Sequence, residues 1–190
     1  KAVEGIRKVD DEGTIALVND GALAVTRLDT GGGVIDLENF GLLTAATVRN
    51  RGLTDDDDIA IEVHGAGLVY TTIEVAEGGA GDVSLLLQDT LTQAGENTLI
   101  RADALTVELP HAVNITTDVN TLTINSYDGR GADGDATVGD ADGRVTAVDQ
   151  SADGLTLENI FVAEGDLNVT AAGDIAIKNV QLNSERRDAI

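Results

Sequence analysis

Two aspartate pairs give the chain its best candidate for binding chemistry. Asp133 and Asp135, then Asp140 and Asp142, form two Asp-x-Asp pairs among glycines. Calcium takes six to eight oxygen ligands, which loops of this kind can supply. The spacing lacks the glutamate that closes an EF-hand and the nine-residue glycine and aspartate repeat of calcium-binding β-rolls. A solvated acidic loop is therefore the expected interpretation, and a calcium site at these four aspartates is the alternative.

Another run of carboxylates, Asp55 to Asp58, precedes an apolar segment. Four adjacent carboxylates cannot all converge on one ion, so we expect this run to form an acidic turn. Apart from the calcium considered above, the sequence predicts no cofactor.

The histidines, carboxylates and aromatic residues of the chain give little support for a catalytic site. His64 and His111 lie 47 positions apart, and neither has a nucleophile or metal-ligand motif beside it. Carboxylates on neighbouring strands could carry out acid–base cleavage of a polysaccharide, but sugar clefts usually offer aromatic side chains. The aromatic residues are instead dispersed along the chain: Phe40, Tyr70, Tyr127 and Phe161. We expect a protein that is not an enzyme.

An internal repeat must position all of these residues. The frame aliphatic-x-aliphatic-x-Asn returns after twenty residues at both ends of the chain, and weaker copies lie between. Short alternating strands separated by glycine, aspartate and asparagine turns are typical of a β-solenoid. Alternation predicts that the aliphatic residues point inward and that the asparagines of adjacent coils stack at a corner. The frames are Ile15-Leu17-Asn19, Ile35-Leu37-Asn39, Leu155-Leu157-Asn159 and Ile175-Ile177-Asn179.

The repeat predicts an all-β fold, a parallel β-helix of about eight coils with roughly 20–24 residues each. One interruption separates Leu122 from Leu155, and its surplus residues form the acidic, glycine-rich stretch 127–143. We therefore expect residues 1–190 to form a single solenoid domain with a loop insertion at 127–143.

Composition narrows the function classes further. Hydrophobic residues make up 42% of the chain but aromatic residues only 2%, a mixture that suits narrow coils lined by small aliphatic side chains. The formal net charge of −22 would repel nucleic acid and anionic membranes, so we expect neither as a partner. Cysteine is absent, so the sequence offers no disulfide framework.

The segment GDLNVTAAGDIAIKNV, within residues 153–182, resembles the repeats of filamentous-haemagglutinin-type exoproteins, the bacterial adhesins exported by two-partner secretion. Residues 13–41 resemble the same repeats less closely. The resemblance implies a right-handed parallel β-helix in a secreted or cell-surface protein, and it carries over no binding residues.

The function expected from the repeats and the resemblance is a non-catalytic structural or adhesive rod of a bacterial surface or extracellular fibre. Its expected partners are further copies joined end to end or neighbouring coils of a longer chain, together with a cell-surface or matrix ligand. Two alternatives stay open: a polysaccharide-binding or polysaccharide-cleaving β-helix protein, and a calcium-stabilised adhesin module.

Overall fold

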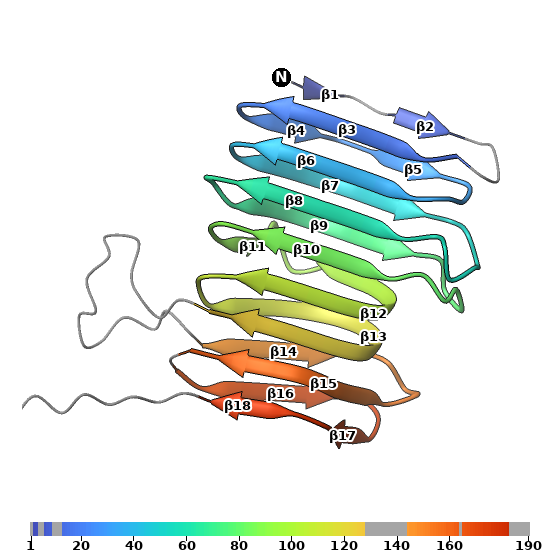
Figure 1. Ribbon diagram of the computed structural model, residues 1–190. Coiled ribbons are helices and arrows are strands. Elements are labelled where there is room, and N and C mark those ends of the chain that lie inside the picture. Colours follow the sequence, from blue (N-terminus) through green and yellow to red (C-terminus); the bar gives the residue numbers. More distant parts are fainter. Residues whose placement is uncertain (1, 4–5, 9–12, 128–143, 164, 183–190) are drawn as a thin grey trace, which may run out of the picture.

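The computed structural model describes residues 2–3, 6–8, 13–127, 144–163 and 165–182. Within these residues the protein is all-β, and eighteen strands form one sheet. The strands stack from β1 and β2 at the top of Figure 1 to β17 and β18 at the bottom. The strands are β1 (Ala2–Val3), β2 (Ile6–Lys8), β3 (Ile15–Asp20), β4 (Leu23–Val25), β5 (Leu28–Thr30), β6 (Ile35–Phe40), β7 (Leu43–Asn50), β8 (Ile59–His64), β9 (Leu68–Val75), β10 (Val83–Leu87), β11 (Leu91–Gln93), β12 (Leu99–Leu109), β13 (Val113–Ser126), β14 (Val145–Asp149), β15 (Leu155–Val162), β16 (Leu167–Ala171), β17 (Ile175–Ile177) and β18 (Val180–Leu182).

The strand pairing is parallel and follows the predicted repeat. Ile15 pairs with Ile35, which pairs with Ile59 on its other side. The same column then continues through weaker copies of the frame, so strands about one repeat apart in sequence lie side by side. This arrangement is consistent with a β-solenoid. The continuing pairs are Ile59–Val83, Val83–Leu105 and Leu105–Leu122.

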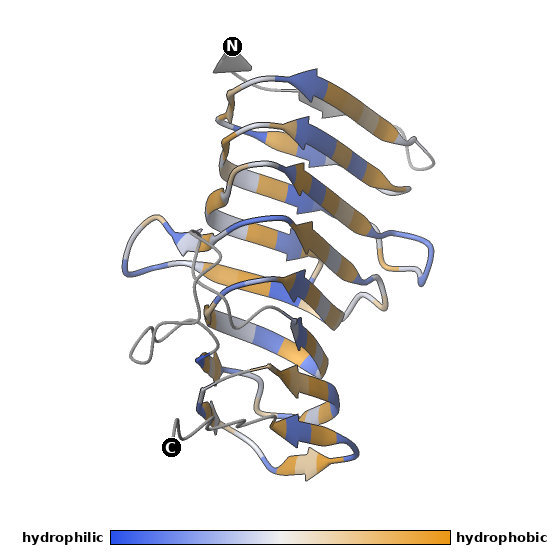
Figure 2. Ribbon diagram, turned by 60° about the vertical axis from the view of Figure 1, so that its left-hand side comes forward, coloured by the Kyte–Doolittle hydropathy of each residue, from blue (hydrophilic) through white to orange (hydrophobic). Residues whose placement is uncertain are grey.

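The core is a continuous column of mostly aliphatic side chains, and it also contains the fully buried Tyr70. In β6, Ile35 and Leu37 are fully buried while Asp36 is exposed, as the alternation predicts. Apolar segments recur along the strands from one end of the stack to the other (Figure 2). Burying one such side chain stabilises the fold by about 1.5–3 kcal/mol relative to leaving it in water.

Stacked asparagines mark one corner, which confirms the prediction for both frame pairs. Asn19 Nδ2 donates to Asn39 Oδ1 at 2.8 Å, and Asn179 Nδ2 donates to Asn159 Oδ1 at 3.0 Å. Asn39 also donates to the carbonyl of Gly41 at 2.6 Å. At that turn Gly41 has a φ of +141°, and a Cβ there would lie 2.8 Å from the backbone of the preceding coil, so only glycine fits.

The regular spacing is interrupted between β13 and β15. Leu122 pairs with Leu157, a separation of 35 residues (157 − 122), whereas Ile15 and Ile35 are separated by 20 (35 − 15). The register also shifts between Leu122 and Thr123. Of the predicted 127–143 insertion, only Tyr127 lies within the described residues, and its side chain is exposed.

A membrane-spanning helix is not found in the described ranges, since none of their segments forms a helix of sufficient length and hydropathy.

Candidate functional site

The C-terminal end of the described stack carries an apolar surface, which we call the terminal face. Its strands β16, β17 and β18 each pair on one side only, with β14 or β15. Ile175, Ile177 and Leu182 are 43%, 67% and 48% exposed. The inward positions predicted for Ile175 and Ile177 are therefore not buried, because within the described residues no further coil covers them. An edge of unpaired strands with apolar side chains is a template for another strand.

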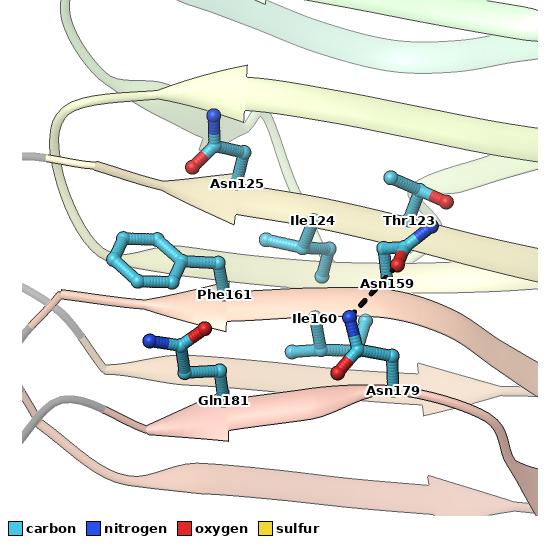
Figure 3. Close-up of a pocket in the computed structure, with 8 residues that line it drawn as sticks. All are labelled: Thr123, Ile124, Asn125, Asn159, Ile160, Phe161, Asn179 and Gln181. Atoms are coloured by element: carbon cyan, nitrogen blue, oxygen red, sulfur yellow. Dashed lines mark hydrogen bonds between the residues drawn. The ribbon is translucent and has the colours of Figure 1, made fainter.

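The outer surface near this end holds a shallow groove of about 320 Å³ (Figure 3). Cross-strand register builds it, because Asn125 of β13 pairs with Phe161 of β15, which pairs with Gln181 of β18. Ile124 and Ile160 are buried beneath the outward-facing side chains. The eight lining residues are Thr123, Ile124, Asn125, Asn159, Ile160, Phe161, Asn179 and Gln181.

The chemistry of this groove is that of amides and one aromatic ring. None of the eight lining side chains is ionisable, so the groove itself has no general acid, general base or charged nucleophile. Amides donate and accept hydrogen bonds, and the Phe161 ring adds an apolar surface. The groove therefore offers hydrogen-bonding and apolar contacts that suit a neutral, hydroxyl-rich molecule, and its lining side chains include no acid–base group.

A second hollow of similar volume lies at a turn of the last two coils, where Asp153 and Asp174 contribute carboxylates. Both side chains are exposed. A catalytic carboxylic acid usually sits in a dry, apolar environment that favours its protonated form. These two aspartates lack that environment.

The predicted calcium ligands, Asp133, Asp135, Asp140 and Asp142, lie outside the described residues, so their role stays a prediction. In the other acidic run, Asp57 is buried and accepts hydrogen bonds from the Gly33 amide at 2.6 Å and from the Thr54 amide and hydroxyl at 2.7 and 2.6 Å. Burial raises the pKa of Asp57, but these donors outweigh burial and lower it overall. Asp57 therefore holds a turn together.

Two further buried aspartates are not apparent in the sequence. Asp29 is 1% exposed and binds Arg51, with Oδ1–Nε and Oδ2–Nη2 distances of 2.8 and 3.0 Å, and it also binds Arg27. Asp149 is 2% exposed and accepts three hydrogen bonds, none from a cation. Arg27 lies just before β5 and Asp29 within it, and this two-residue spacing was the one available sequence signal for the first site.

The two histidines are half-buried on the outside of the stack, His64 at the end of β8 and His111 in the turn after β12. His111 Nε2 is 3.6 Å from one carboxylate oxygen, that of Asp89. His64 has two carboxylate neighbours, Glu38 and Glu62, on strands β6 and β8. Within the described part of the chain, this trio is the group of side chains whose ligand atoms are close enough together to hold a metal ion.

No protein-family model, curated protein or solved structure matches this chain.

Proposed function

We propose that this protein is a non-catalytic structural or adhesive rod of a bacterial surface or extracellular fibre, built as a right-handed parallel β-helix of about eight coils. The observation that carries the proposal is the terminal face, where Ile175 and Ile177 are exposed on β17, a strand that pairs on one side only within the described residues. A right-handed sense is also the strong preference for parallel strands connected by crossovers. The bacterial and extracellular setting rests on the repeat resemblance.

The terminal face fits another coil of the same kind. Its aliphatic side chains would enter the column that already runs through the stack, and the unpaired strand edges would gain parallel partners. That coil comes either from a longer parent chain or from a second copy added end to end. The net charge of −22 discourages sideways clumping, which favours growth along the axis.

The test is the size distribution of the purified protein over a concentration series, by light scattering and electron microscopy. End-to-end subunits should form particles that lengthen with concentration, and Ile175→Asp should abolish that growth. Leu86→Asp is the matched control, because Leu86 is 39% exposed on the outer surface of β10, against 43% for Ile175.

A protein that stays monomeric at all concentrations would exclude a second copy as the source of the coil that covers the terminal face. The remaining source would be a longer parent chain. If particles of the Ile175→Asp variant still lengthen with concentration, the terminal face is not the surface through which subunits join. Turnover of a polysaccharide, abolished by a single aspartate-to-asparagine change, would overturn the non-catalytic rod altogether.

A second candidate function, binding of a neutral polysaccharide as a surface or matrix ligand, is favoured by the amide-lined groove of Figure 3. Stacking on aromatic side chains and hydrogen bonds to amides are complementary to sugar rings and hydroxyls. If this groove binds glycans, Phe161→Ala should abolish binding on a glycan array. Phe40→Ala, at an exposed ring on β6, should leave it unchanged and is the control.

A further inference from the structure

Three potential metal ligands converge on the outer surface of β6 and β8, far from the terminal face. Parallel register places Glu38 beside Glu62 and Phe40 beside His64. His64 Nε2 lies 3.2 Å from Glu38 Oε1 and 3.1 Å from Glu62 Oε1. All three ligand atoms lie within 4.8 Å of one another. One imidazole nitrogen therefore faces two carboxylate oxygens on a rigid sheet.

We propose that Glu38, Glu62 and His64 form a binding site for a divalent first-row transition metal ion, with zinc as the representative ion. Imidazole nitrogen and carboxylate oxygen are established zinc ligands at bond lengths near 2.0–2.1 Å, which in a tetrahedron places ligand atoms about 3.3 Å apart. The two imidazole–carboxylate distances, 3.2 and 3.1 Å, are close to that spacing. The ion can thus enter with small side-chain adjustments.

Two neighbouring side chains orient the histidine for this role. The Phe40 ring stacks on the imidazole with a centroid distance of 4.5 Å and an interplanar angle of 14°, which fixes the plane of the ring. The Gln88 amide nitrogen, Nε2, lies 3.1 Å from His64 Nδ1, and a half-turn of the amide would bring its oxygen to the same place. With its amide turned so that the oxygen accepts the Nδ1 proton, Gln88 leaves the Nε2 lone pair free for the ion.

The site is also open enough to complete a coordination shell. The side chains of His64, Glu38 and Glu62 are 21%, 36% and 42% exposed. Water can therefore occupy the fourth position, as it does in zinc sites with three protein ligands.

The acidic surface as a whole would attract any cation, so the imidazole must provide the selectivity. Hard ions such as magnesium prefer oxygen ligands, whereas zinc, nickel and copper also favour imidazole. The chain supplies its own control, because its other histidine, His111, has one carboxylate neighbour among the described residues, Asp89 at 3.6 Å.

The test is a zinc titration of the full chain. Calorimetry measures the affinity and stoichiometry, and the NMR signals of the two imidazoles report where the ion binds. The titration is run at about 0.15 M salt to screen the general acidic field, with millimolar magnesium to occupy hard oxygen sites. We expect one zinc ion per chain and a shift of the His64 imidazole signals at substoichiometric zinc, with His111 unmoved. His64→Gln and Glu38→Gln should weaken binding by more than about tenfold, and Gln88→Leu by about tenfold. His111→Gln should bind as the unaltered protein does.

Glu38→Gln keeps the shape of a half-exposed side chain and should leave the fold intact, so a loss of binding in that variant points to the lost carboxylate charge. The proposal is overturned if zinc does not bind under these conditions. It is equally overturned if the His64→Gln variant retains full affinity, or if the two histidine variants lose affinity equally.

Discussion

The aliphatic side chains of the same aliphatic-x-aliphatic-x-Asn frame are buried in the N-terminal part of the molecule and exposed at its C-terminal end. Ile35 and Leu37 in β6 are 0% exposed, whereas their counterparts Ile175 and Ile177 in β17 are 43% and 67% exposed. Strand β6 pairs with β3 on one side and β8 on the other, but among the described strands β17 pairs with β15 alone. The sequence pattern therefore determines which side of a strand faces the column, while the neighbouring coils determine whether that side is buried. Stability in such a stack lies largely between repeats.

The largest effect is expected from the same substitution made at two equivalent frame positions, one buried and one exposed. Ile35→Ala leaves a cavity in a closed core and should lower the free energy of unfolding by about 2–5 kcal/mol. Ile175→Ala removes methyl groups that are already partly in water and should cost about 1 kcal/mol or less. Urea unfolding, monitored by circular dichroism at low protein concentration, measures both. Equal losses would mean that the terminal face is covered in solution and would remove the contrast.

A smaller effect is expected at the asparagine corner. Asn39 is 0% exposed, accepts a hydrogen bond from Asn19 and donates one to Gly41, so Asn39→Ala should cost about 1–3 kcal/mol by leaving buried partners unsatisfied. Asn179 makes the equivalent bond to Asn159 in water, and Asn179→Ala should cost about 0.5 kcal/mol. The same urea experiments measure the difference. A cost at Asn179 that matches Asn39 would show that the corner bond stabilises the fold irrespective of burial.

The repeat itself could be predicted from the sequence, because period-two alternation and twenty-residue spacing directly specify inward faces and stacked asparagines. The weaker copies between these frames, around Ile59, Val83, Leu105 and Leu122, show the same alternation, and all lie in the paired column. This success has a simple physical cause: each element is short, local in pattern and paired with the next copy of itself.

The candidate sites could not be predicted in the same way, because they join outward-facing residues of different coils. Glu38 and Glu62 are 24 positions apart (62 − 38), a spacing that differs from the twenty-residue frame because the intervening turns are longer. The amide groove likewise depends on a register shift after Leu122. Turn lengths set these registers, and a single sequence gives turn lengths poorly. The burial of Asp29 and Asp149 depends on the same cross-coil geometry.

The smallest expected effect compares these two buried aspartates through the pH dependence of stability. Burial raises the pKa of Asp29, but hydrogen bonds and charge from Arg51 and Arg27 outweigh it, so the pKa lies below its usual range. Burial also raises the pKa of Asp149, and there the hydrogen bonds from Val119, Thr117 and Ser151 only partly offset it, so the pKa lies above its usual range.

The two shifts act in opposite directions with pH. A lowered folded-state pKa contributes stability above the unfolded-state value near 4, and that contribution is lost as pH falls through the folded-state pKa. A raised pKa contributes stability below the unfolded-state value, and that contribution is lost as pH rises through the folded-state pKa. As pH falls from 7 toward 3, the stability of the unaltered protein relative to Asp29→Asn should therefore decrease. Relative to Asp149→Asn it should increase.

Urea midpoints across this range measure both differences, and subtracting each variant's profile cancels the large common effect of the acidic surface. Profiles that change in the same direction would show that the arginine pair does not distinguish these two carboxylates, because burial alone moves both pKa values upward.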